Sequence, residues 1–108
     1  MNDKLLNISI QRGGELFVHV KQTLEFVDIC QNENLVIIGI EGFKLDNYVT
    51  KPQLDIIADF SPNLPPKDWL MFKNQTNQAA KTFLLNFIQK KDLWFTFVTL
   101  TEKELTSS

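Results

Sequence analysis

Two apolar runs in the middle of the chain, within residues 35–60 (LVIIGIEGFKLDNYVTKPQLDIIADF), constrain the fold more than any other feature. Both are typical of buried β-strands, yet three carboxylates interrupt them: Glu41 in the first run, Asp55 and Asp59 in the second. An isolated carboxylate is costly to bury unless it is paired, coordinated or protonated. These acids therefore lie either on a solvated sheet face or in a functional site.

The first run predicts a central strand over residues 35–43, because apolar side chains occupy both of its faces. Gly39 and Gly42 indicate bulges or places where another group packs closely. Asp46-Asn47 predicts a turn, and residues 54–60 predict a second strand. One face of that second strand carries Leu54, Ile56, Ala58 and Phe60, and the other carries Asp55, Ile57 and Asp59.

Two interpretations compete for the residues that precede these strands. Leu16, Val18 and Val20 alternate with other residues, which favours the return strand of a hairpin across Gly13-Gly14. Helical spacing of apolar residues instead favours a helix over about 17–33, ended by Asn34 in a left-handed cap. We favour the helix. Residues 6–10 alternate in the manner of a short strand.

The second half of the chain follows a loop, SPNLPP, whose three prolines exclude regular structure over residues 61–66. Residues 67–73 predict a short helical turn and residues 76–90 a second helix. The buried stripe of that helix would be Ala80, Phe83, Leu84, Phe87 and Ile88. Residues 93–100 (LWFTFVTL) predict a strand from their β-branched and aromatic content, and the polar residues 101–108 predict a frayed end.

This order of elements predicts one α+β domain over residues 1–108. We expect a two-layer sandwich with two helices packed on a three- to four-stranded, mainly antiparallel sheet. The chain of 108 residues is 44% hydrophobic, with nine Phe, so it can bury a real core. Trp69, Phe72 and the aromatic residues of 93–100 are expected to serve this core.

Charge and cysteine content exclude several classes of function. The net charge is −2, but residues 25–60 hold seven acidic and two basic groups, net −5. With Arg12 the only arginine, this balance argues against nucleic acid as a partner. The single Cys30 excludes an intramolecular disulfide and suits a reducing cytoplasm. The first residues lack a signal-peptide core, and no run reaches the length of a membrane span.

The carboxylates are the best candidates for a site. If residues 35–43 and 54–60 pair, Glu41, Asp55 and Asp59 can share one sheet face, where they would meet a cation, a basic ligand or a basic protein surface. A solvated face of an antiparallel sheet is the simpler alternative. We expect no metal and no cofactor, since no Asp-x-Asp spacing or phosphate-binding glycine loop is present. A carboxylate pair for acid–base catalysis would need a cleft for its substrate.

Two other reactive side chains are expected to have no catalytic role. His19 predicts an exposed helix residue, and Cys30 a small core residue. Eleven residues separate them, about 16 Å along one helix, which excludes a Cys–His dyad there.

The segments GIEGF (39–43) and DIIADFS (55–61), followed by Trp69 and a helix, resemble an arrangement found in small bacterial immunity-type proteins, loosely over residues 24–100. The resemblance implies an α+β cytoplasmic inhibitor, encoded beside a toxin, that covers the toxin's active site with an acidic face. Glu41, Asp55 and Asp59 are the residues that match this role.

We therefore expect a non-catalytic, cytoplasmic protein-binding module whose acidic face meets a basic protein surface. Its candidate contact residues are Glu41, Asp55, Asp59, Asp46 and Tyr48. Two alternatives stay open: a small ligand- or metal-binding protein or enzyme that uses the same carboxylates, and a structural homodimer.

Overall fold

A five-stranded antiparallel sheet in the order β1-β2-β5-β3-β4 forms the frame of the molecule. The computed structural model describes residues 3–106. Along the chain the elements are α1 (Asp3–Asn7), β1 (Ile10–Arg12), β2 (Glu15–His19), a 3-10 turn (Val20–Gln22), α2 (Thr23–Asn32), β3 (Val36–Leu45), β4 (Thr50–Asp59), α3 (Trp69–Leu85), β5 (Leu93–Leu100) and α4 (Glu102–Thr106).

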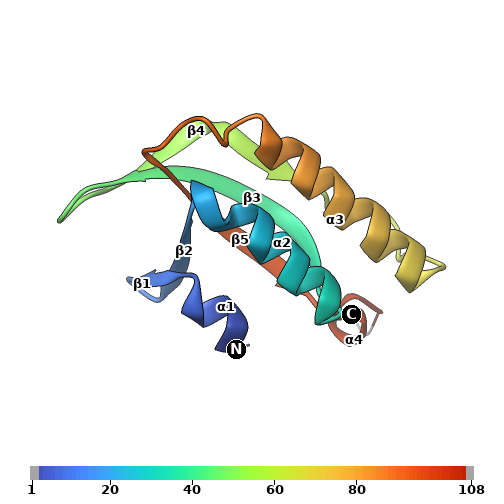
Figure 1. Ribbon diagram of the computed structural model, residues 1–108. Coiled ribbons are helices and arrows are strands. Elements are labelled where there is room, and N and C mark those ends of the chain that lie inside the picture. Colours follow the sequence, from blue (N-terminus) through green and yellow to red (C-terminus); the bar gives the residue numbers. More distant parts are fainter. Residues whose placement is uncertain (1–2, 107–108) are drawn as a thin grey trace.

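The two long helices, α2 and α3, lie on the same side of the sheet (Figure 1). Between helices and sheet lies the main core, which joins residues of α2, such as Phe26 and Cys30, and of α3, such as Leu84, to Ile40 and Phe95 of the sheet. The predicted α+β sandwich is confirmed, with a sheet of five strands. Because the helices cover one face, residues that alternate with the core positions lie on the other, open face.

The additional strands arise where we favoured a helix over 17–33, and that interpretation is wrong for its first part. Gly13 and Gly14 both have positive φ, 59° and 83°, and turn β1 into β2. Two successive positive φ angles match the turn that the twist of a two-residue hairpin requires. Phe17 and Val18 are both buried although they point to opposite sides of the strand. Because both faces of this strand are buried, its apolar residues do not alternate strictly and imitate the spacing of a helix.

The predicted end of α2 is confirmed. Asn34 has φ 62°, and the N–H of Leu35 donates to the carbonyl of Cys30 at 2.9 Å. This bond is the six-to-one bond that closes a helix after a left-handed residue. It directs the chain from α2 straight into β3.

Both ends of the described chain form short helices where none was predicted. The expected strand over 6–10 is wrong: α1 occupies Asp3–Asn7, its Leu5 is buried in the core, and β1 starts only at Ile10. At the other end, α4 starts with reciprocal bonds between Thr101 and Glu104, which satisfy free backbone groups of its first turn. Of the predicted frayed end, residues 107–108 lie outside the described chain.

One continuous helix, α3, replaces the predicted helical turn and second helix. Asp68 caps it by accepting a hydrogen bond from the N–H of Met71 at 3.0 Å. The helix ends at Leu85, five residues before the predicted end, since the Asn86 side chain donates to the carbonyls of Thr82 and Phe83 and competes with further helical bonding. Of the predicted stripe, Ala80 and Leu84 are fully buried.

A buried amide fixes α3 against β3. The Oδ1 of Asn77 accepts a hydrogen bond from the N–H of Ile37 at 2.9 Å, and its Nδ2 donates to the carbonyl of Leu35 and to Gln31. Beside it the buried Lys73 donates to the Gln31 carbonyl and to Asn34. These bonds satisfy backbone groups at the junction of α2 and β3, which would be costly to leave unpaired.

Strand β3 is central, as predicted, between β5 and β4. Its register with β4 shifts between Glu41 and Gly42, so residues 54–56 of β4 have no partner in the ladder. Ile56 occupies the space above Gly42, where a Cβ would lie 2.6 Å from its Cγ2. Leu54, predicted to share the core face, is 79% exposed because the bulge breaks the alternation there.

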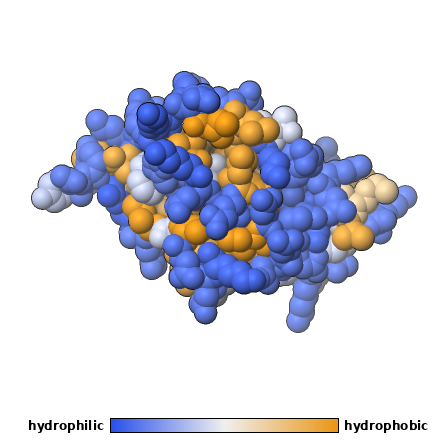
Figure 2. Space-filling view, viewed as in Figure 1, coloured by the Kyte–Doolittle hydropathy of each residue, from blue (hydrophilic) through white to orange (hydrophobic). Residues whose placement is uncertain are grey.

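Figure 2 shows the helix-covered side of the molecule, in which polar residues surround smaller areas of apolar surface. Glu41 and Asp59 belong to the opposite face of the sheet, as the strand register shows.

Candidate functional site

The register places Glu41 on the open sheet face, in the row that also holds Ile57 of β4 and Thr96 of β5. Directly opposite side chains in an antiparallel sheet lie about 4.5–5.5 Å apart at Cβ. Glu41 is exposed, and within residues 3–106 it makes no hydrogen bond or ion pair. Its charge is therefore directed to solvent or to a partner.

Asp59 shares this face with Glu41. It pairs with Gly39 of β3, two residues from Glu41, which makes the two acids diagonal neighbours, about 7–8 Å apart by sheet geometry. The Asp59 carboxylate accepts a hydrogen bond from the N–H of Ser61 at 2.9 Å, and this bond lowers its pKa. The acid is thus ionised at neutral pH, beside Glu41.

Asp55 stands apart from this pair. It lies in the bulged residues 54–56 and has no partner on β3, so the ladder does not hold it in the row of Glu41. It is exposed and, in the described part of the chain, free of ion pairs and hydrogen bonds. The structure brings Glu41 and Asp59 together in the ladder and leaves Asp55 beside the edge of the sheet.

Asp46 and Tyr48 lie at the tip of the β3–β4 hairpin. Asp46 is five residues beyond Glu41, roughly 17 Å at 3.3 Å per residue. The Asp46 carboxylate accepts hydrogen bonds from the N–H groups of Tyr48 (3.0 Å) and Val49 (2.7 Å), and these bonds lower its pKa. Asp46 therefore stabilises the turn. Tyr48 lies at the same tip, away from the row of Glu41 and Ile57, and its side chain is 95% exposed.

Exposed apolar residues flank the two acids, although the sequence patterns gave these apolar residues no functional role. Ile57, opposite Glu41, is 52% exposed, and Val98, opposite Gly39, is 54% exposed. Gly39 between them adds no side chain, so Val98 and Ile57 remain accessible. In the sequence, Ile57 could be found from its place between Asp55 and Asp59 on the acidic face of its strand. Val98 joins this face through the register of β5 with β3, which the sequence does not show.

Aromatic side chains close the other end of the open face. Phe43 pairs with Trp94, and its ring meets that of Phe17 edge to face at 5.2 Å. Trp94 is half-buried and contacts the ring of His19. The large aromatic residues here serve packing, and the exposed part of the face is the strip around Glu41, Ile57, Asp59 and Val98, which we call the acidic strip.

His19 is not the exposed helix residue that we predicted. It ends β2, where its Nε2 lies 2.8 Å from the carbonyl of Lys91 and its Nδ1 accepts from the N–H of Lys21. The Nε2 contact joins β2 to the start of β5, and the Nδ1 bond caps the 3-10 turn Val20–Gln22. Cys30 is fully buried, as predicted, and burial raises the pKa of its thiol to about 12.

Among residues 3–106, no three His, Cys, Asp or Glu side chains gather closely enough to hold a metal ion. Over the same residues, no helix is both long and apolar enough to cross a membrane. The arrangement on the open face offers charge and exposed apolar surface.

Comparison with known proteins adds no family: no protein-family model matches the chain, and no curated protein matches it significantly. The fold and the acidic strip therefore define the protein as an α+β sandwich with one open sheet face.

Proposed function

We propose that the protein is a non-catalytic, cytoplasmic protein-binding module whose acidic strip meets a basic surface of a partner protein. The observation that carries the proposal is the proximity of two exposed acids, Glu41 and Asp59, to exposed Ile57 and Val98 on the sheet face opposite α2 and α3 (Figure 1). Apolar centre and charged surroundings are the common composition of protein interfaces.

The charges of the strip favour a protein partner over a nucleic acid. Glu41 and Asp59 would repel phosphates, whereas Lys and Arg of a partner would be attracted and steered toward them. Three of the chain's lysines are engaged elsewhere, in ion pairs with Glu33, Asp92 and Asp28. Within residues 3–106 neither Glu41 nor Asp59 takes part in an ion pair, so both charges are available to an external cation.

The resemblance to immunity-type proteins gives this proposal its more specific form. A nuclease-type toxin presents Lys and Arg to bind phosphates, and an acidic inhibitor would cover those side chains. In that form, Glu41 and Asp59 would pair with the toxin's basic residues, while Ile57 and Val98 would supply the apolar contact.

Charge reversal tests the proposal. Affinity capture from an extract of the native host would compare the wild type with Glu41→Lys/Asp59→Lys and with a matched control, Asp3→Lys/Glu25→Lys, which makes the same change of net charge on exposed helix residues. We expect a basic protein to be retained by the wild type and the control, released by added salt, and lost with the strip variant. The captured protein would then be purified and its affinity for all three chains measured by calorimetry.

Equal affinity of the purified partner for the strip variant and the wild type would contradict the proposal. So would a thermal stabilisation by a divalent cation that the strip variant abolishes, because it would favour the ligand- or metal-binding alternative. A doubled mass in light scattering that the strip variant halves would favour the homodimer.

A further inference from the structure

Within residues 3–106, the second half of β5 has a strand neighbour on one side and none on the other. β2 pairs with β5 only at Trp94 and Phe95, whereas β3 pairs with it as far as Leu100. Half of the backbone N–H and C=O groups of an edge strand point away from its neighbour. Over residues 97–100, no such outward group bonds to backbone of the described chain outside the ladder with β3.

The strand order leaves β1 and β4 as the outer strands of the sheet, and the longer of the two, β4, differs in chemistry from the open part of β5. β4 carries Pro52, the charged Lys51, Asp55 and Asp59, and a bulge. Proline, charge and bulges are the usual means by which an edge strand avoids pairing with another chain. Residues 97–100, FVTL, contain no proline and no charge. The register shift opposite Val98 and Thr99 places its extra residue, Ile38, in β3, so the backbone of β5 stays regular and this edge is competent to pair.

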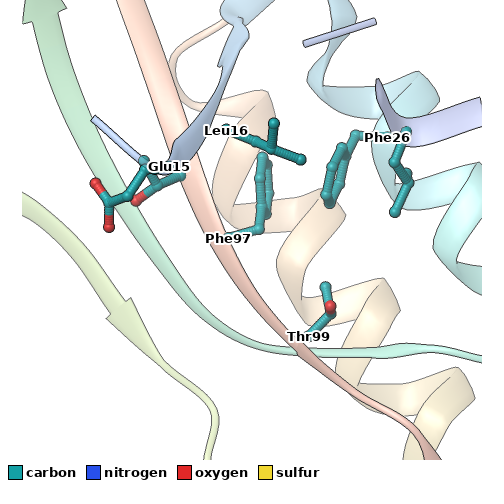
Figure 3. A pocket seen from close by; sticks show the side chains of 8 residues that line it. Glu15, Leu16, Phe26, Phe97 and Thr99 are labelled. Atoms are coloured by element: carbon teal, nitrogen blue, oxygen red, sulfur yellow. The ribbon is translucent and has the colours of Figure 1, made fainter. Parts of the chain in front are cut away.

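A hollow of about 230 Å³ lies beside this edge. Its lining includes Leu5 of α1, Leu16 of β2, Phe26 of α2, and Phe97 and Thr99 of β5. Figure 3 shows Leu16, Phe26 and Phe97 directed toward one another around it, and the rings of Phe26 and Phe97 stack at 4.1 Å. The volume suits one or two apolar side chains and is below the usual range for small-molecule sites.

We propose that an extended peptide segment of a partner protein adds as a strand to residues 97–100 of β5 and inserts an apolar side chain into this hollow. Backbone bonds to an edge strand give such binding its affinity, and a neighbouring pocket gives it specificity. This surface is distinct from the acidic strip and does not depend on the function proposed for it.

The shape of the site favours a peptide over a second copy of the chain. The edge is recessed, because α1, β2 and α2 all contribute to the walls of the hollow beside it. A single strand can enter such a trough, whereas the β5 edge of a second copy would arrive with its own α1 and β2. The geometry therefore selects a slender, extended occupant.

Charge near the two ends of the edge indicates the composition of the peptide. Exposed Glu15 lies at the hollow, and Glu102 and Glu104 follow the end of β5, with Lys103 as the cation among them. This balance is complementary to a peptide with Lys or Arg beside its apolar residues.

A displayed library of random eight-residue peptides is the probe that tests the proposal. We expect enriched sequences that alternate apolar and β-branched residues and carry Lys or Arg at their ends. A synthetic copy of the best sequence should slow amide hydrogen exchange at residues 97–100 of the wild-type protein. This measurement needs no variant.

Two variants locate the site. Leu16→Asp places a charge in the wall of the hollow, and Thr99→Lys places a guarding charge on the edge. Each variant should raise the Kd for the synthetic peptide by at least about tenfold. Glu41→Lys/Asp59→Lys should leave this Kd unchanged. Circular dichroism and thermal melts check that the variants are folded.

The proposal is overturned if no peptide is enriched, or if the enriched peptide protects amides elsewhere and is lost only with the acidic-strip variant. A concentration-dependent dimer that protects residues 97–100 in the absence of peptide would overturn it in favour of a second copy.

Discussion

At the scale of single residues, burial decides which reactive side chains are available. Cys30 and His19 are the two nucleophilic or basic side chains that a sequence reader first considers for catalysis. Cys30 has no exposed surface, and both ring nitrogens of His19 are engaged with backbone groups. Each therefore has a structural role.

The Cys30 thiol predicts a loss of stability at high pH. Its pKa is raised to about 12 in the folded protein, whereas a thiol in an unfolded chain ionises near about pH 8.5. Below that pH both states are protonated, and the stabilisation is complete. As pH rises above it, only the unfolded chain releases the proton, so the free energy of unfolding falls, by at most about 1.4 kcal/mol per pH unit.

Urea unfolding at pH 7 and pH 10 measures this effect, with Cys30→Ala as the control. The variant should be less stable at pH 7 because it leaves a small cavity, but its stability should fall less between the two pH values. Parallel slopes for the two proteins would show that Cys30 does not carry the effect. Native Cys30 should also resist thiol reagents that modify the unfolded chain.

At the scale of elements, the sequence located most strands and helices but not their junctions. β5 coincides with the prediction, because its β-branched and aromatic residues leave little alternative. β2 was the alternative that we did not favour, because Leu16–Val20 fits both the strand period and the helix period, and the positive φ angles of Gly13 and Gly14 select the hairpin. α3 began earlier than predicted, because the cap at Asp68 joins two segments that apolar spacing alone separates.

The contact between Gly42 and Ile56 predicts which glycine of β3 contributes more to the stability of the fold. In Gly42→Ala the new Cβ would lie 2.6 Å from Ile56 Cγ2 and 2.9 Å from its Cβ, so the bulge of β4 must move. We expect a loss of about 1–3 kcal/mol in the free energy of unfolding, as for overpacked cores. Urea titration at pH 7 measures it.

Gly39→Ala is the matched control, since its Cβ would meet Val98 at 3.4 Å, an ordinary contact. It should cost less than Gly42→Ala. Equal losses in the two variants would mean that the close approach of Ile56 has no special weight and that glycine is simply preferred along β3.

At the scale of the whole molecule, the acidic strip should be separable from folding. Glu41 and Asp59 are exposed, and the network that fixes α3 to β3 lies on the opposite side of the sheet. We therefore expect Glu41→Lys/Asp59→Lys to keep the circular dichroism spectrum and to shift Tm by less than about 4 °C. A larger fall in Tm would mean that these acids serve the fold, and lost binding by the variant could then no longer be assigned to the strip.

The sequence by itself determined the α+β class, the mainly antiparallel sheet and the burial of Cys30, because apolar periodicity and turn residues act over a few neighbours. Only the tertiary structure decided that Glu41 and Asp59 share a row while Asp55 falls in a bulge, since the position of Ile56 above Gly42 shifts the register of β4. It also decided that residues 97–100 of β5 remain at an open edge, because β2 diverges after two pairs. Register and strand order depend on contacts between distant segments, and no local pattern encodes them.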